Sequence, residues 1–294
     1  MTAHVAERGE GRGRVVLGLD CSADCDDAVI AAAILVARSF GAEIEGFLIE
    51  DRQIFDAAGY TFAREISPGH DTAGRPLMVD EMSRRMALSA RAAGRRITEL
   101  AAAASVPLAL SHVRDTPVGA LVRACQAAGP WNVVALGEPL STATLDRLEG
   151  LFERVGGMTG VVIAARSAAR SRRAATPGPV VAVVEHPDRL AGMVRTASRI
   201  AAAASAPIVV AVLAESRAGM SWLAAEVRAA LPEDDRLALQ ELAQPGGGVA
   251  VIAESLRRLH AGFVIAELGG LVLPPGGDMR PLAATLACPL LVVR

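Results

Sequence analysis

Two stretches of the same kind decide the fold: Arg14-Val-Val-Leu-Gly-Leu-Asp20 and Pro179-Val-Val-Ala-Val-Val-Glu185. Each is a short apolar run that ends in an acidic residue. An alanine-rich helical pattern follows each run, at about 24–39 and from 187 onward, and a second apolar run follows that, at 42–51 and 207–213. Buried strands that alternate with helices indicate a parallel sheet covered on both faces.

The parallel between the halves continues to the end of the chain. Third strands are expected at 108–113 and 237–242, helices opened by proline and glycine at 116–119 and 245–248, fourth strands at 132–137 and 262–269, and fifth strands at 160–165 and 289–294. The sequence therefore predicts two tandem five-stranded α/β domains, 14–166 and 179–294. The segment 167–178 lacks apolar periodicity and is the expected linker, and 52–79 is an insert in the first domain.

Composition and charge exclude several function classes. The 294 residues suit two domains, and a 52% hydrophobic content is ample for buried cores. The balance of 30 basic against 32 acidic residues gives no general nucleic-acid footprint. All basic residues are arginine, which excludes a Walker phosphate loop and Schiff-base chemistry. Neither a signal peptide nor a membrane span is recognisable, so the expected location is the cytoplasm.

Both halves resemble universal stress protein domains. The resemblance is carried by the opening 15–22, by the ending 287–294 and by the repeated order of elements, and it covers nearly all of 14–294 except 52–79. It implies a five-stranded α/β fold that binds adenine nucleotide at the carboxyl ends of the strands. It also implies that two domains pair through their last strands, so we expect an internal pseudo-dimer in which the strands 160–165 and 289–294 meet.

In the first half, the resemblance implies a nucleotide contact at Asp20 and a phosphate loop after the fourth strand. Gly137 and Gly150 keep the outer glycine spacing of that loop. Leu140 replaces its middle glycine and Leu151 replaces its hydroxyl residue. An apolar side chain there blocks the approach of the backbone to a phosphate, so the first site is predicted to be eroded.

In the second half, Glu185 takes the acidic position. Gly269, Gly276 and Gly277 are the candidate loop glycines, but the loop is short, holds two prolines and lacks the hydroxyl residue. We expect no bound cofactor or weak binding of ATP, and if ATP binds at all, it binds this half.

Other candidate sites have simpler interpretations. The glycines 246–248 suggest either an anion site or a tight strand-to-helix turn, and the turn is favoured. Cys21 and Cys25 suggest a metal or redox pair, but the aspartates around them oppose thiolate formation, which favours a buried structural cysteine. The five histidines are scattered, so no catalytic residue is assigned.

The insert is rich in aromatic residues against a poor background. Phe55, Tyr60 and Phe62 lie in 54–66, and the helix expected at 80–104 carries an arginine-rich face. This combination is typical of a partner-binding element, while the alternative is a lid packed over its own domain. In either case, we expect the three rings to be covered in the functional assembly.

These patterns favour a universal stress protein-like binding or regulatory protein that is not an enzyme. One alternative is an ATP-binding switch or weak ATPase that uses the second-half pocket. Another is a structural partner protein that binds through 54–66 and 80–104. The expected partners are adenine nucleotide and a protein, or a second copy bound through 54–66; no nucleic acid is expected.

Overall fold

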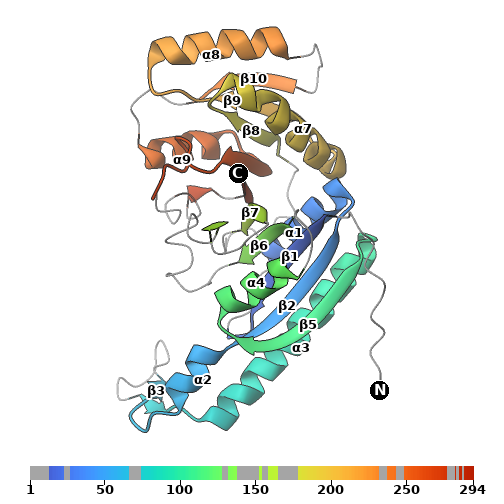
Figure 1. The fold of residues 1–294 in the computed structure, drawn as a ribbon, viewed down its shortest axis with the longest axis vertical. Helices are drawn as coiled ribbons and strands as arrows, with labels where there is room; N and C mark the ends of the chain where they lie inside the picture. Colours follow the sequence, from blue (N-terminus) through green and yellow to red (C-terminus); the bar gives the residue numbers. More distant parts are fainter. Residues whose placement is uncertain are drawn as a thin grey trace.

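A computed structural model describes residues 13–22, 27–65, 74–127, 132–137, 152–153, 158–164, 178–231, 237–242, 248–276, 282, 285–286 and 288–294. The molecule is elongated, and the two halves of the chain follow one another along its long axis (Figure 1). Among the described residues, no helix is long and apolar enough to cross a membrane.

Ten of the strands form one sheet. The first half contributes β1 (Arg14–Asp20), β2 (Glu43–Asp51), β5 (Leu108–Asp115), β6 (Asn132–Gly137) and β7 (Met158–Ala164). The second contributes β8 (Val180–Val184), β9 (Ile208–Val212), β10 (Leu237–Glu241), β11 (Phe263–Glu267) and β12 (Leu290–Val293). Their order is β10-β9-β8-β11-β12-β7-β6-β1-β2-β5. Each half therefore repeats the same strand order, and this ten-stranded, mostly parallel sheet confirms the predicted α/β fold.

The halves meet where their last strands pair. β12 runs antiparallel to β7 with Leu291 opposite Val162, whereas every other pair in this sheet is parallel. Both side chains are buried. Helix α1 (Asp27–Phe40) packs on α7 (Pro187–Ala204) across the same junction. The predicted pairing of the terminal strands is confirmed, and apolar burial on both sides of the seam explains it.

Helices cover the sheet where the apolar periodicity predicts them. They include α3 (Val79–Ala103), α4 (Pro117–Gln126) and α9 (Val249–Arg258), and α8 (Arg217–Ala230) is a further helix of the second half. The Thr116 hydroxyl caps α4 by accepting from the amide of Gly119 at 3.2 Å, as the proline-glycine opening suggests. Helix α8 is not among the predicted elements, although Ser216 caps it in the same way.

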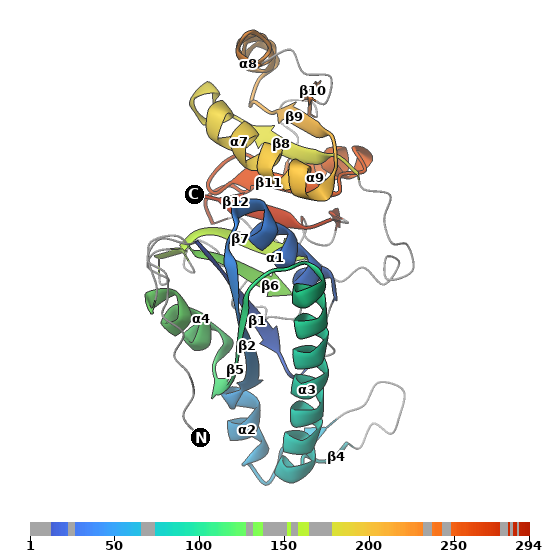
Figure 2. The same cartoon turned by 90° about the vertical axis from the view of Figure 1, so that its right-hand side faces the viewer.

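The insert forms the end of the molecule farthest from the second half. It contains α2 (Arg52–Ala58) and a hairpin of β3 (Arg64–Glu65) and β4 (Arg75–Pro76). Helix α3 starts at this end and runs beside β2 and β5 (Figure 2). The described parts of the segment 52–79, at 52–65 and 74–79, thus project from the first half. The boundary at 167–178 stays a prediction, because 165–177 lie outside the described residues.

A buried arginine ties β1 to its neighbours at the amino end of the sheet. Arg14 is 3% exposed, pairs with Glu45 on β2 and donates to the carbonyl of Ala124 on α4 at 2.7 Å. Burial raises the pKa of the adjacent Cys125 thiol to about 11. That thiol therefore stays protonated at neutral pH and serves packing.

Candidate functional site

The strand order reverses direction between β1 and β6, and again between β8 and β11. In open α/β sheets, ligands bind at the carboxyl ends of strands at such switch points. Asp20 is the last residue of β1, and Glu185 directly follows β8. The structure therefore places both predicted acidic residues at the switch point of their own half.

In the second half, the Glu185 carboxylate bonds to the loop that follows β11. The amide of Leu271 donates to its Oε2 at 2.5 Å, and the amide of Val272 donates to its Oε1 at 3.2 Å. A Cβ atom at Gly270 would collide with this carboxylate. Glu185 thus fills a backbone donor site that a side chain at position 270 would crowd.

The same loop is closed by its own backbone. The amide of Gly269 donates to the carbonyl of Leu273 at 3.0 Å, and Gly269 has a positive φ of +82°. Val272 and Leu273 are buried beneath. Three amides of this loop that could face an anion, at 269, 271 and 272, are therefore drawn into contacts within the chain.

Of the other glycines predicted for this site, the structure describes Gly276 but not Gly277. Gly276 has φ of +68°, and a Cβ atom at Gly276 or Gly269 would meet nothing within 4 Å. Both positions favour glycine for their backbone conformation rather than for a crowded contact. Gly277 lies outside the described residues, as do Gly246 and Gly247 of the other glycine cluster. Gly248 is the cap residue of α9.

Electrostatics at the second switch point disfavour a charged Glu185. Burial raises the pKa of this carboxyl, and the hydrogen bonds from Leu271 and Val272 oppose the rise. The nearby Glu267 carboxylate, at the end of β11, adds to it. Glu267 itself pairs with Arg189 of α7 at 2.8 Å. Two carboxyl groups thus lie close together at this switch point, His186 lowers the pKa of Glu185 slightly, and the cation Arg189 is already paired with Glu267.

The first switch point is built differently. The Asp20 carboxylate accepts a hydrogen bond from the amide of Ser22 at 2.7 Å. This bond closes a local turn directly after β1. Gly137 ends β6, whereas Leu140, Gly150 and Leu151 lie outside the described residues. The predicted erosion of the first phosphate loop therefore stays a prediction.

The cysteine interpretation is limited in the same way. Cys21 is buried, and Cys25 lies outside the described residues. In the part of the chain that the structure describes, no group of three His, Cys, Asp or Glu side chains could hold a metal ion.

A second surface feature lies on the insert. The rings of Tyr60 and Phe62 stack with centroids 5.2 Å apart and are 59% and 76% exposed. Phe55 is half-buried, with the Arg114 guanidinium 3.9 Å above its ring. The lid interpretation is therefore wrong for the Tyr60–Phe62 pair within this chain, because the pair stands clear of the domain. Phe55 alone packs back on it.

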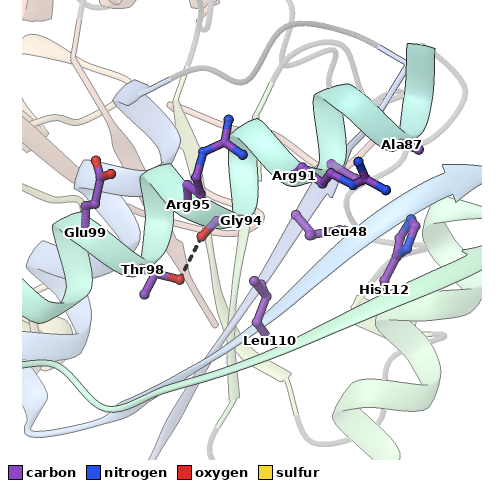
Figure 3. A pocket seen from close by; sticks show the side chains of 10 residues that line it. Leu48, Ala87, Arg91, Gly94, Arg95, Thr98, Glu99, Leu110 and His112 are labelled. Atoms are coloured by element: carbon purple, nitrogen blue, oxygen red, sulfur yellow. Dashed lines mark hydrogen bonds between the residues drawn. The ribbon is translucent and has the colours of Figure 1, made fainter. Parts of the chain in front are cut away.

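A groove of about 610 Å³ lies between α3 and the edge strand β5, as Figure 3 shows. Its lining residues are Leu48, Ala87, Ala90, Arg91, Gly94, Arg95, Thr98, Glu99, Leu110 and His112. His112 donates from Nε2 toward the buried Glu50 carboxylate at 3.1 Å, and Arg114 pairs with the same carboxylate at 2.7 Å. The arginine-rich face of α3 was visible in the sequence. The groove itself was not, because it depends on how α3 lies over β5.

Comparisons with known proteins give likeness of structure only. No protein-family model matches the chain. No curated protein matches it either. A universal stress protein from Archaeoglobus fulgidus has a similar structure, with a TM-score of 0.56 and 15% identity over 96% of each chain. A putative universal stress protein from Pseudomonas aeruginosa gives 0.53 and 14%, with 96% of this chain and 93% of that one covered.

The same fold also occurs in another setting. The cytoplasmic domain of a prokaryotic cation chloride cotransporter matches with a TM-score of 0.50 and 9% identity, over 96% of this chain and 95% of that one. At these identities the likeness carries the fold and no activity. The paired halves, the repeated strand order and these matches together show that this chain has the universal stress protein fold.

Proposed function

We propose that this chain is a universal stress protein-like binding or regulatory protein without catalytic activity, with eroded adenine-nucleotide sites. The observation that supports this most directly is the Glu185 carboxylate, which accepts from the amides of Leu271 and Val272. Phosphate-binding loops work by presenting free backbone N–H groups to the ligand. Here the chain's own carboxylate takes these donors.

A nucleotide phosphate would have to displace Glu185 from these amides and, wherever that carboxyl is ionised, lie beside its charge. Two like charges 4 Å apart repel by roughly 4 kcal/mol at an effective dielectric constant of 20. Glu267 adds a second carboxylate nearby, and its cation Arg189 is already paired. Both features disfavour a triphosphate in this pocket.

The test is nucleotide binding by the full chain. We expect no nucleotide in the absorbance spectrum of the purified protein and a calorimetric Kd for ATP·Mg²⁺ weaker than about 1 mM, equivalent to about 4 kcal/mol. Tight binding by the wild type would contradict the proposal. In that case Asp20→Ala and Glu185→Ala, measured side by side, would assign the ligand to one half.

The alternative is an ATP switch or weak ATPase that uses Glu185, Gly269, Gly276 and Gly277. It is favoured by the free space at Gly269 and Gly276, where the backbone can approach a ligand. Phosphate release above the buffer rate, abolished by Glu185→Gln, would support this alternative and contradict a non-catalytic role.

A further candidate role is partner binding or self-association through 54–66. It is favoured by the exposed Tyr60–Phe62 pair, since large exposed aromatics commonly mark interfaces. Sedimentation velocity should show that Tyr60→Ser with Phe62→Ser lowers the associated fraction. The matched control is Trp222→Ser on α8, which removes an equally exposed aromatic elsewhere. Equal behaviour of both variants would contradict this role.

A further inference from the structure

We propose that the groove between α3 and β5 binds an extended acidic segment of a partner protein, which adds to the sheet as a strand beside β5. This deepens the partner-binding role above and rests on it, but it names a different surface from the Tyr60–Phe62 pair. Its three supports are a free strand edge, an apolar groove beside that edge and two uncompensated cations over the groove.

The first support is the outer edge of β5. Among the described residues, β5 pairs with β2 on one side and with no strand on the other. The amide of Ile44 on β2 donates to the carbonyl of Pro107. Because bonding alternates along a parallel ladder, the odd-numbered residues of β5 bond to β2, and the backbone groups of Leu110 and His112 face outward. A long, unpaired strand edge is a template for a further strand.

The other edge of the sheet differs. Strand β10 has five residues against the eight of β5, and its exposed positions include Gln240 and Glu241. An acidic segment would meet like charge there. The two edges are therefore not equivalent, and within the described part of the chain β5 is the edge that combines an unpaired backbone with a positive border.

The second support is the shape of the groove. Leu48 and Leu110 project from the sheet toward α3, as Figure 3 shows. Gly94 lets the helix come close, because a Cβ atom there would lie 3.3 Å from Leu110 and 3.4 Å from Leu48. A groove between an edge strand and a helix receives alternate side chains of an added strand, while backbone hydrogen bonds hold its main chain. This geometry fits an extended peptide better than a compact ligand.

The third support is charge. Arg96 pairs with Asp27 at 2.7 Å, and Arg114 pairs with Glu50. In contrast, Arg91 and Arg95 are exposed and have no acidic partner among the described residues, although both line the groove. Figure 3 shows Arg91 near His112 at one end of the groove and Glu99 at the other. The occupant therefore places its carboxylates at the Arg91 end.

The probe is an eight-residue peptide with a fluorescent label, in which every second residue is threonine. The groove-facing positions between them alternate valine and glutamate. Binding to the full chain is followed by fluorescence anisotropy at low salt. We expect saturable binding that weakens at least about tenfold in Arg91→Gln with Arg95→Gln, since tenfold corresponds to 1.4 kcal/mol. The matched control is Arg195→Gln with Arg228→Gln, two exposed arginines on α7 and α8, which should leave binding unchanged.

A second peptide separates strand addition from simple charge attraction. Its sequence is identical, but alternate backbone nitrogens are methylated so that it cannot pair with a strand edge. Loss of binding with this peptide supports the proposal. Equal binding by the methylated peptide, or an equal loss in the control variant, would overturn it.

The outcome is separable from the other proposals. If the peptide fails to bind while Tyr60→Ser with Phe62→Ser still lowers association, the partner-binding role stands and the groove assignment falls. If a single-stranded oligonucleotide binds more tightly than the peptide and depends on Arg91 and Arg95, the occupant is a nucleic acid and the proposal is wrong.

Discussion

The acidic residues at the two switch points, Asp20 and Glu185, occupy equivalent places in the repeat but have different partners. Asp20 bonds to an amide two residues away, whereas Glu185 reaches two amides more than 80 residues away. A local bond fixes a turn, while a distant bond closes a loop over the end of the sheet. Among the described residues, the acid of the first half therefore fixes its own turn, whereas the acid of the second half is tied to the loop that follows β11.

The largest expected effect is at the seam that the two halves share, between β7 and β12. Leu291→Asp should cost about 4 kcal/mol of unfolding free energy, because it buries a charge without a partner. Val162→Asp, directly opposite, should cost about as much. Urea unfolding followed by circular dichroism measures both.

The conservative Leu291→Met should cost less than about 1.5 kcal/mol. Two well-separated transitions in the wild type would contradict a shared seam, since they would mean that the halves unfold independently.

The next largest effect separates the two acids themselves. Glu185→Ala leaves the amides of Leu271 and Val272 without their acceptor and should cost about 3 kcal/mol. Asp20→Ala removes one local bond near solvent and should cost about 1 kcal/mol or less. Chemical denaturation of both variants tests the ranking. Equal losses would mean that the distant bonds of Glu185 add nothing over a local turn.

A substitution at Gly270 tests the same Glu185 contact from the side of the loop. Gly270→Ala should cost about 1–2 kcal/mol, because its Cβ would displace the Glu185 carboxylate. Gly192→Ala, in the open middle of α7, should instead stabilise by about 0.5–1 kcal/mol. In the double variant of Glu185→Ala and Gly270→Ala, the two losses should not add, because both act on one contact. Simple additivity in thermal melts would count against that contact.

The smallest effect is a dependence on pH. The folded pKa of Glu185 is raised above its ordinary value of 4.5 by burial, so the folded state holds this proton more tightly than the unfolded state. Its contribution to stability is complete below the unfolded pKa and is lost as pH rises through the folded pKa. Relative to Glu185→Gln, the wild type should therefore gain stability as pH falls from about 8 to about 4. A flat or opposite difference in unfolding free energy would contradict this.

Much of the fold could be predicted because its signals are local. Runs such as 15–19 and 180–184 are apolar along their whole length, which indicates a strand buried on both faces. The pairing of the last strands also followed, since both are uncharged up to their ends and would otherwise be exposed edges. Helix α8 was not predicted, although Ser216 marks its start with a cap of the usual kind.

The candidate site was predicted only in part, because its decisive contacts are not local. The position of Glu185 after a central strand is visible in the sequence, and so is the pair Gly269-Gly270. Which of the glycines faces the carboxylate depends on how the loop folds back, and no pattern in either segment indicates that. The groove beside β5 could not be predicted for the same reason, since Leu48, Arg91 and Leu110 come from three separate elements.

The seam between β7 and β12 joins two halves of one chain, which affects both their association and how each half can change. Because both partners belong to one polypeptide, their association does not depend on protein concentration. A symmetric dimer of single domains would carry every substitution twice, once in each subunit. In this chain each half changes alone, so the second half can close a loop with Glu185 and the first half can carry helix α2, and neither feature is duplicated.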